Sequence, residues 1–143
     1  MKHLQTGVIV EGTTNVEDII EGLCDDLRRV DDPEAAKLAA RFEKEVANSA
    51  PEHYDEILVE LENEALSFAP DFTYFGNQEG DGACYGLWAD VEAVSEMRHF
   101  GELPEYDDVD EDYEGLACNV TDHGNVSLLL VKGSETQELW SVV

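Results

Sequence analysis

The chain has 143 residues, of which 34 are Asp or Glu and only 8 are Lys or Arg, so its formal net charge is −26. This charge excludes direct binding to nucleic acid or to an anionic membrane, because both are bound through phosphates that Lys and Arg neutralise. Hydrophobic residues make up 43% of the chain, which excludes a disordered acidic tail. The length fits a single domain over residues 1–143, mainly helical in residues 1–70 and strand-rich in residues 71–143.

The location of the protein is predicted from what the sequence lacks. No stretch approaches the ~20 consecutive apolar residues of a membrane span, and residues 1–7 lack the apolar core of a signal peptide. Cys24, Cys84 and Cys118 are odd in number and have no CxxC spacing, so neither a disulfide framework nor a zinc site is predicted. We therefore expect a cytoplasmic protein with buried free thiols and no cofactor.

Three segments of the first half show the apolar spacing of helices, after a short expected strand over residues 4–10. Thr14 or Asn15 can cap the first helix, Pro33 suits the first position of the second, and the third follows Pro51. The expected buried faces are Val16, Ile19, Ile20, Leu23, Leu27 and Val30; Ala35, Leu38, Phe42 and Val46; and Tyr54, Ile57, Leu58, Leu61, Ala65 and Phe68.

The centre of the chain changes to strand composition. Residues 72–75 and 83–88 are aromatic and β-branched, and residues 76–82 contain three glycines, so we expect two strands joined by a wide turn. The glycines lack the spacing of a phosphate-binding loop, and no Lys lies beside them. Asp90 is placed to cap a short helix after the second strand.

The end of the chain has the strongest strand pattern. After an irregular acidic stretch at about residues 100–114, three expected strands are separated by short turns: 116–120, 126–131 and 138–143. Helices that precede a group of strands are typical of the α+β class. The sequence therefore predicts an α+β fold, with N-terminal helices packed on a mostly antiparallel sheet from the C-terminal half.

Two runs in the second half form a distinctive combination. One contains Phe75-Gly76, Gly80-Asp81-Gly82 and Tyr85-Gly86-Leu87-Trp88; the other contains Val120-Thr121-Asp122-His123-Gly124-Asn125-Val126 and Glu138-Leu139-Trp140-Ser141-Val142-Val143. Over roughly residues 60–143 the chain resembles small acidic uncharacterised proteins encoded by bacteriophages and plasmids. The resemblance implies a shared fold and an origin in a mobile element, where small acidic proteins that block host machinery are a familiar class. It implies no activity and no site.

Two loops invite comparison with a calcium site. An EF-hand loop needs oxygen ligands at positions 1, 3 and 5, Gly at position 6 and Glu at position 12. Counted from Asp110, position 12 is Thr121, and counted from Asn77 it is Trp88. We therefore expect no specific metal site, although weak cation binding in either loop stays open.

His123 beside Asp122, with Ser127 nearby, raises the alternative of a small hydrolase. Neighbours along one chain do not make a catalytic triad, which depends on converging geometry, and Asp122 also suits an ordinary turn. We expect no catalytic residue, and a binding protein rather than an enzyme.

The acidic residues of the third helix form a regular row. Glu52, Glu56, Glu60 and Glu64 recur every four residues, about 6 Å apart along the axis. Like charges at this spacing destabilise a helix by roughly 0.2–0.5 kcal/mol per pair, and we expect relief only from the lysines of the second helix, Lys37 and Lys44. The row is either a solvated face or a negative ridge that fits a basic groove.

The sequence thus favours an acidic binding protein, an inhibitor or nucleic-acid mimic that occupies a basic site on a host protein such as a nucleic-acid-binding enzyme. The alternative is that the acidity serves solubility in a salt-rich cytoplasm and that the function lies elsewhere. The predicted contact residues are Glu52, Asp55, Glu56, Glu60, Glu64, Glu105, Asp107, Asp108, Asp110, Glu111, Asp112 and Glu114.

Overall fold

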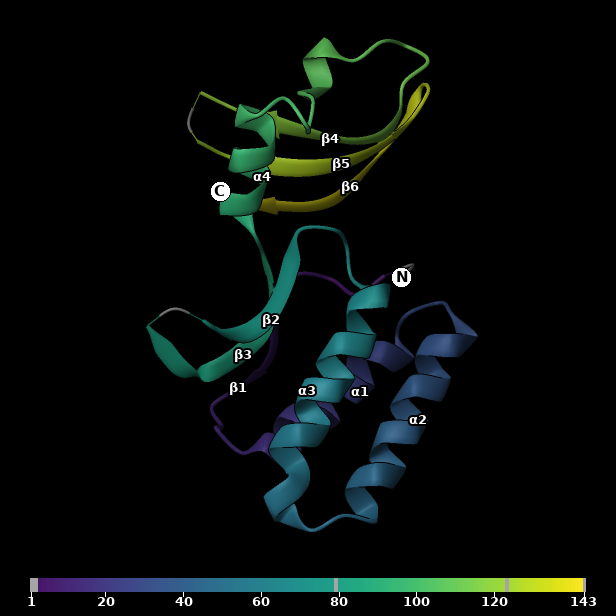
Figure 1. The fold of residues 1–143 in the computed structure, drawn as a ribbon, viewed down its shortest axis with the longest axis vertical. Coiled ribbons are helices and arrows are strands. Elements are labelled where there is room, and N and C mark those ends of the chain that lie inside the picture. The colour runs from purple at the N-terminus through teal and green to yellow at the C-terminus, as the bar shows by residue number, and fades with distance from the viewer. Residues whose placement is uncertain (1–2, 79, 123, 143) are drawn as a thin grey trace. The chain divides into compact units, whose positions relative to one another are not determined.

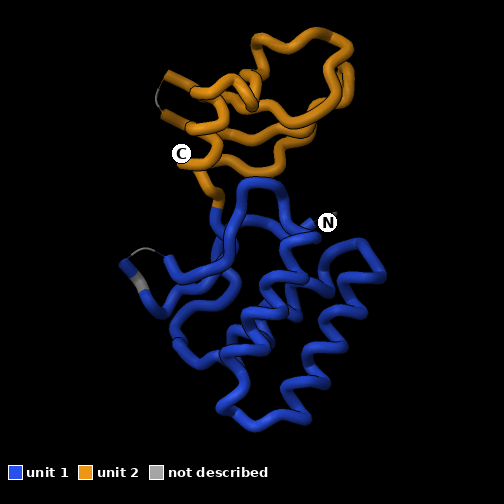
Figure 2. Tube along the Cα trace, viewed as in Figure 1, with its two compact units in different colours: residues 1–88 blue, residues 89–143 orange. Residues whose placement is uncertain are grey.

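The computed structural model describes residues 3–78, 80–122 and 124–142, and its helices and strands confirm the predicted α+β class (Figure 1). The chain divides into two compact units, residues 1–88 (unit 1) and residues 89–143 (unit 2), coloured separately in Figure 2. The single domain expected from the length stays a prediction. The first strands of the strand-rich half belong with the helices in unit 1, so the division falls later than the change in composition at residue 70.

The described part of unit 1 contains three helices, and the short 3-10 turns η1 and η2 flank the third. Their bounds are α1 Val16–Arg28, α2 Pro33–Ala47, η1 Pro51–His53, α3 Tyr54–Ala65 and η2 Leu66–Phe68. The side chain of Asn15 accepts a hydrogen bond from the Glu17 N–H at 3.0 Å, and that of Asp32 from the Glu34 N–H at 2.9 Å. Each cap satisfies a backbone donor that the first turn of a helix leaves free, which explains where α1 and α2 begin.

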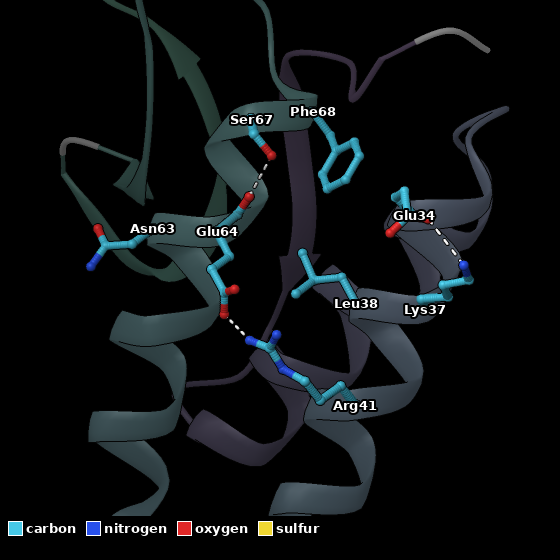
Figure 3. A pocket seen from close by; sticks show the side chains of 8 residues that line it. All are labelled: Glu34, Lys37, Leu38, Arg41, Asn63, Glu64, Ser67 and Phe68. Atoms are coloured by element: carbon cyan, nitrogen blue, oxygen red, sulfur yellow. Dashed lines mark hydrogen bonds and ion pairs between the residues drawn. The ribbon is translucent and has the colours of Figure 1, made fainter.

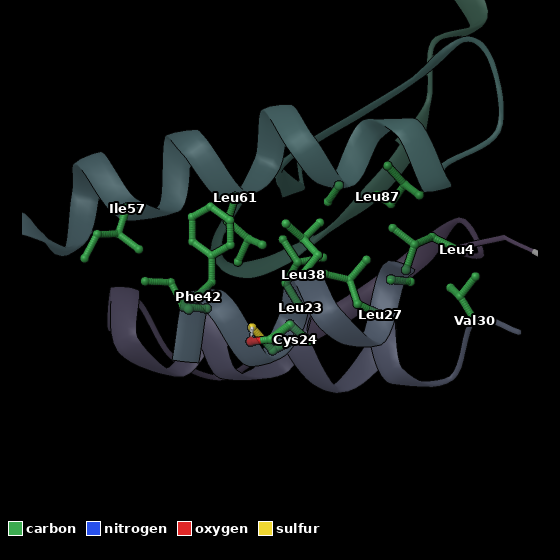
Figure 4. Close-up of a cluster of buried hydrophobic side chains, with 14 residues drawn as sticks. Leu4, Leu23, Cys24, Leu27, Val30, Leu38, Phe42, Ile57, Leu61 and Leu87 are labelled. Carbon is green, nitrogen blue, oxygen red and sulfur yellow. Dashed lines mark hydrogen bonds between the residues drawn. The ribbon is translucent and has the colours of Figure 1, made fainter. Parts of the chain in front are cut away.

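The predicted apolar faces of the three helices meet in one core (Figure 4). Leu23 and Leu27 of α1, Phe42 of α2 and Leu61 of α3 are completely buried. Tyr54, Leu58, Phe68, Val16 and Val46 are only partly buried and pack around this cluster. Burying a Leu or Phe side chain contributes about 1.5–3 kcal/mol, so this cluster is the main source of stability in unit 1.

A three-stranded sheet lies against the core of unit 1. Its strands are β1 (Gly7–Glu11), β2 (Thr73–Gln78) and β3 (Asp81–Ala89), in the order β1-β3-β2, with β1 antiparallel to β3. Leu87 of β3 is a member of the buried cluster. The helices of the first half therefore pack on a sheet, as predicted.

Two predicted boundaries in this sheet are wrong. The first strand begins at Gly7 instead of residue 4, because Leu4 is buried in the helical core and its N–H donates to the Phe68 carbonyl at 2.8 Å. The wide turn at 76–82 is also wrong, because β2 continues to Gln78 and β3 begins at Asp81. The Gly76 carbonyl accepts a hydrogen bond from the Trp88 indole at 2.8 Å, which holds this glycine within the sheet.

The residues described in unit 2 form one helix, a 3-10 turn and a second three-stranded sheet. The bounds are α4 Val91–His99, η3 Tyr106–Asp108, β4 Glu114–Val120, β5 Val126–Lys132 and β6 Glu135–Val142. The strand order is β4-β5-β6 and both pairs are antiparallel, which confirms the two predicted hairpins. Asp90 caps α4 by accepting from the Ala93 N–H at 3.1 Å.

The interior of unit 2 is smaller than that of unit 1. Val94 of α4, Ala117 and Cys118 of β4 and Leu128 of β5 are completely buried. The segment before η3 runs beside β4, since the Cys118 N–H donates to the Pro104 carbonyl at 2.9 Å. Across the described residues of both units, no helix has the length and apolar character needed to span a bilayer.

Candidate acidic binding surfaces

The acidic row expected on the third helix is shorter than its spacing suggests. Glu56, Glu60 and Glu64 lie in α3, but Glu52 lies in η1, because the α-helix begins only at Tyr54. Like Glu56 and Glu60, the neighbouring Asp55 is exposed. The continuous helical part of the row therefore contains three carboxylates.

Part of this row is already compensated by cations of unit 1. Glu64 forms an ion pair with Arg41 of α2 (Figure 3). His53 lies 3.7 Å from Glu52 and 4.0 Å from Glu56, close enough to offset their charge when the imidazole is protonated. The row is therefore a poorer candidate for a free negative ridge than the sequence suggested.

The expectation that only Lys37 and Lys44 could relieve the row is wrong, because Arg41 pairs with Glu64. Lys37 pairs with Glu34 of its own helix at 3.0 Å. Arg41 takes that role instead, one turn further along α2. Its guanidinium lies 4.7 Å from the centre of the Phe42 ring, so it sits beside the buried face of α2. The position of Arg41 next to a core aromatic was the sequence signal that could have identified it.

One acidic residue of α3, Glu62, faces the sheet of unit 1 instead of solvent. The hydroxyl of Tyr85 donates to its carboxylate at 2.6 Å. Burial raises the pKa of Glu62, and the hydrogen bond from Tyr85 offsets part of this rise. Burial also raises the pKa of Tyr85 well above the usual range of a tyrosine, so its hydroxyl stays protonated and acts as the donor. Glu62 thus connects α3 to β3.

The acidic segment of unit 2 surrounds a hollow of about 710 Å³, here named the acidic hollow. It is lined by residues of the segment and of the β5–β6 turn: Tyr106, Asp107, Val109, Asp110, Glu111, Asp112, Val131, Gly133 and Ser134. Four of the predicted contact residues therefore come together here. They were found from the sequence as a charge run, whereas their common hollow was not predicted.

The other predicted contacts in this segment lie elsewhere. Glu105 forms an ion pair with Arg98 of α4, and both line a different hollow together with Asp108. Glu114 opens β4 and lies opposite Lys132 of β5 in the ladder. The structure thus distributes the run of acids over three places, and only Asp107 and residues 110–112 line the acidic hollow.

The acidic hollow is held in place by backbone hydrogen bonds. The Tyr113 N–H donates to the Asp110 carbonyl at 3.0 Å, and the Gly133 N–H donates to the Tyr113 carbonyl at 3.1 Å. The Tyr113 hydroxyl donates to the Leu116 carbonyl at 2.6 Å. The acidic segment is therefore tied to both β4 and the β5–β6 turn, so its carboxylates project from an ordered surface.

The carboxylates of the acidic hollow have no cation beside them in the part of the chain that the structure describes. Unit 2 contains 14 acidic and 2 basic residues, against 20 and 6 in unit 1. Its Arg98 pairs with Glu105, and its Lys132 lies between Glu114 and Glu135 in the ladder. Both cations of unit 2 are thus placed outside the acidic hollow.

Two kinds of reactive site were considered among the described residues, a metal centre and an activated thiol. No group of three or more His, Cys, Asp or Glu among them is placed to hold a metal ion. Burial raises the pKa of the Cys24 thiol to about 12 and also raises that of Cys118, so neither thiol is activated as a nucleophile. His123, considered above for catalysis, lies outside the described residues, as does Glu79, which belongs to the loop compared with a calcium site from Asn77 onward.

Comparison of the chain with protein-family models, curated proteins and solved structures finds no match. The resemblance to bacteriophage and plasmid proteins stays a prediction.

Proposed function

We propose that this chain is an acidic binding protein, and that the acidic hollow of unit 2 captures a basic surface of a host protein. The observation that supports this most directly is a set of ordered carboxylates, Asp107 and 110–112, that no described cation neutralises. Clustered like charges destabilise the compact state. Lysines and arginines of a partner would remove this repulsion on docking, which gives the arrangement a physical purpose.

The remaining lining of the acidic hollow suits basic side chains. Tyr106 is 39% exposed as a residue, and an aromatic ring attracts an ammonium or guanidinium group placed over its face. Val109, which is partly buried, adds apolar surface on which the methylene stem of Lys or Arg can rest. Carboxylates, an aromatic ring and apolar surface together match a long basic side chain better than a hydrated metal ion.

The charge of unit 2 is comparable with that of duplex DNA. Its net charge is −12 over 55 residues. Duplex DNA has one negative charge per about 1.7 Å of axis, so this equals the charge of roughly 20 Å of duplex. A compact unit of this size has a radius of gyration of about 10 Å, and twice this radius is about 20 Å. The net charge of unit 2 per unit length is therefore similar to that of duplex DNA. The partner would accordingly be a surface that otherwise binds nucleic-acid phosphates.

The test is displacement of a labelled DNA duplex from a purified basic DNA-binding protein, at salt concentrations between about 50 and 500 mM. The variant Asp110→Asn/Asp112→Asn removes two charges from the acidic hollow. The control variant Glu92→Gln/Glu96→Gln removes two exposed charges from α4 in the same unit. We expect the first variant to displace DNA at least about fivefold less well, and the control less than about twofold.

Displacement by the wild type should weaken steeply as salt rises, since a contact between opposite charges is screened by ions. Equal losses of DNA displacement in the two variants would mean that the electrostatic field of the whole protein causes the displacement, and not the acidic hollow. Displacement that is indifferent to salt would contradict the proposal as a whole.

The alternative of salt adaptation is favoured by one observation, the presence of a large acidic excess in both units. At molar salt the Debye length is about 3 Å, so repulsion between surface carboxylates is almost fully screened. This hypothesis expects the chain to unfold in dilute buffer and to fold as salt is added. A cooperative fold at 50 mM salt, measured by circular dichroism during urea unfolding, would contradict it.

A further inference from the structure

A groove of about 480 Å³ between the first two helices contains a second set of carboxylates, which the sequence analysis did not single out. It is here named the α1–α2 groove. Ile20, Val46 and Ala47 provide its apolar lining, and Tyr54 of α3 lies at it as well. A volume of this size lies within the range of sites that take small ligands or a few side chains.

The acidic lining comes mainly from one face of α1. Glu17, Glu21 and Asp25 follow one another every four residues, so they share a helix face and lie about 6 Å apart along the axis. Glu43 of α2 contributes a further carboxylate. The groove thus combines an apolar floor with negative walls, unlike the solvated row on α3.

An internal cation already occupies part of the groove. Arg28 of α1 forms an ion pair with Glu43 of α2 and lies 3.9 Å from Asp25. The hydrogen bond from Arg28 holds the pKa of Glu43 below its usual value. The walls therefore hold one guanidinium group of the chain itself, where Arg28 lies between Asp25 and Glu43.

The other carboxylates of α1 in the groove have no such partner. Within the described residues, Glu17 and Glu21 make no ion pair, and both are exposed. Ile20, between them in sequence, is 2% exposed and forms part of the floor. Among the described residues, Arg28 is the one Lys or Arg that lines the groove, so both carboxylates are available to a basic group of another molecule.

We infer that the α1–α2 groove binds a Lys or Arg side chain of the basic partner. The methylene stem rests on Val46 and Ala47, and the charged head lies between Glu17 and Glu21. The apolar floor favours a basic side chain over a hydrated metal ion, which would gain nothing from it. The inference rests on the proposed function, and it adds to it a second contact, in unit 1, and the chemistry of the bound group.

The experiment measures the Kd of a fluorescein-labelled hexapeptide of alternating Lys and Ser at about 50 mM salt. In an extended peptide, alternate side chains lie about 6.6 Å apart, close to the spacing of the carboxylates on α1. The variant Glu17→Gln/Glu21→Gln should raise Kd about fivefold. Its control, Glu56→Gln/Glu60→Gln on α3, makes the same change in charge at the same spacing and should raise Kd less than about twofold.

A third variant tests whether the space in the α1–α2 groove is needed for binding, independently of its charge. Ala47→Trp at the end of α2 fills the floor without altering any charge, and Ala47 is exposed, so the core is not disturbed. We expect it to weaken the peptide about as much as the loss of the two α1 carboxylates. Circular dichroism during urea unfolding checks that all three variants are folded.

The outcomes distinguish this inference from the proposed function. Equal losses of peptide affinity in the α1 and α3 variants would contradict binding in the α1–α2 groove. No effect of Ala47→Trp on the Kd would contradict it as well. Spermidine that binds more tightly than the peptide at the same residues would overturn the assignment to a partner side chain. If Asp110→Asn/Asp112→Asn abolishes peptide binding and the groove variants keep it, the inference about the α1–α2 groove is wrong and the proposed function is retained. The opposite pattern would overturn the acidic hollow as the capture site.

Discussion

Units 1 and 2 have similar net charges, −14 and −12, but on 88 and 55 residues. Unit 1 offsets part of its charge where helices meet, since Arg28 joins α1 to α2 and Arg41 joins α2 to α3. In unit 2 the carboxylates of the acidic hollow have no described cation beside them, although the backbone around them is ordered. Net charge alone therefore does not locate a binding surface, and the carboxylates that the fold leaves uncompensated are better candidates.

The two tryptophans allow this comparison to be measured, because Trp88 lies in unit 1 and Trp140 in unit 2. Replacing either one by Phe leaves a single fluorescent reporter. The unfolding of each variant below is therefore measured twice, once with Trp88 as the only tryptophan and once with Trp140 as the only tryptophan.

The largest effect is expected from Gly86→Ala in β3. An added Cβ would overlap the backbone oxygen of Gly7 and lie 2.7 Å from the Trp88 ring. Since a backbone atom cannot move aside easily, we expect the unfolding free energy of unit 1 to fall by about 3 kcal/mol. Urea unfolding followed by Trp88 measures it, and the transition followed by Trp140 should hardly move. The control is Gly82→Ala in the same strand, where a Cβ meets nothing within 4 Å. Equal shifts of both reporters would show that the units unfold together.

A smaller effect is expected from Gly22→Ala in α1, where the added Cβ would overlap a methyl group of Val10 in β1. Alanine favours a helix by about 1 kcal/mol over glycine, so the overlap must exceed this gain for the variant to be destabilised. We expect a net loss of about 1–2 kcal/mol in the transition followed by Trp88. In the Val10→Ala background the same change should stabilise unit 1, because the methyl group is gone. Destabilisation in both backgrounds would mean that α1 and β1 do not approach as described.

Added salt should change the unfolding free energies of the two units by different amounts. The difference should be on the order of 1 kcal/mol, because each repelling pair costs roughly 0.2–0.5 kcal/mol. Raising NaCl from about 50 mM to 1 M screens the carboxylates of unit 2 but also weakens the interhelical ion pairs of unit 1. The urea midpoint followed by Trp140 should therefore rise more than the midpoint followed by Trp88. Equal gains would remove the distinction between compensated and uncompensated charge.

The smallest effect is expected from Glu62→Gln at the junction of α3 and β3. Since burial raises the pKa of Glu62 in the folded state, its charged form costs stability above that pKa. The amide keeps an oxygen that accepts from Tyr85, so we expect a gain in stability of less than about 1 kcal/mol at pH 7. The gain should disappear as the pH falls below 4.5, the ordinary value for Glu, where the wild-type carboxyl is protonated in both states. The exposed Glu60→Gln is the control, and an equal gain there would contradict a role for burial.

Local features of the fold were predictable from the sequence because their causes lie within a few residues. Asn15, Asp32 and Asp90 cap the helices that follow them, and the spacing of apolar residues identified the faces that become buried. The hairpins of unit 2 followed from turn chemistry in the same way. The start of β1 was mispredicted because Leu4 joins a core formed by residues far along the chain.

The candidate site was predictable only in part. The sequence by itself determined how many carboxylates the protein has and which of them follow one another in the helices and in the acidic segment. Tertiary structure decided which carboxylates are paired with a cation. Arg41 of α2 pairs with Glu64 of α3, whereas the acids beside the β5–β6 turn have no described cation next to them. The reason is physical, because helix caps and apolar periodicity act between near neighbours, whereas an ion pair between elements depends on where the packed core places two long side chains.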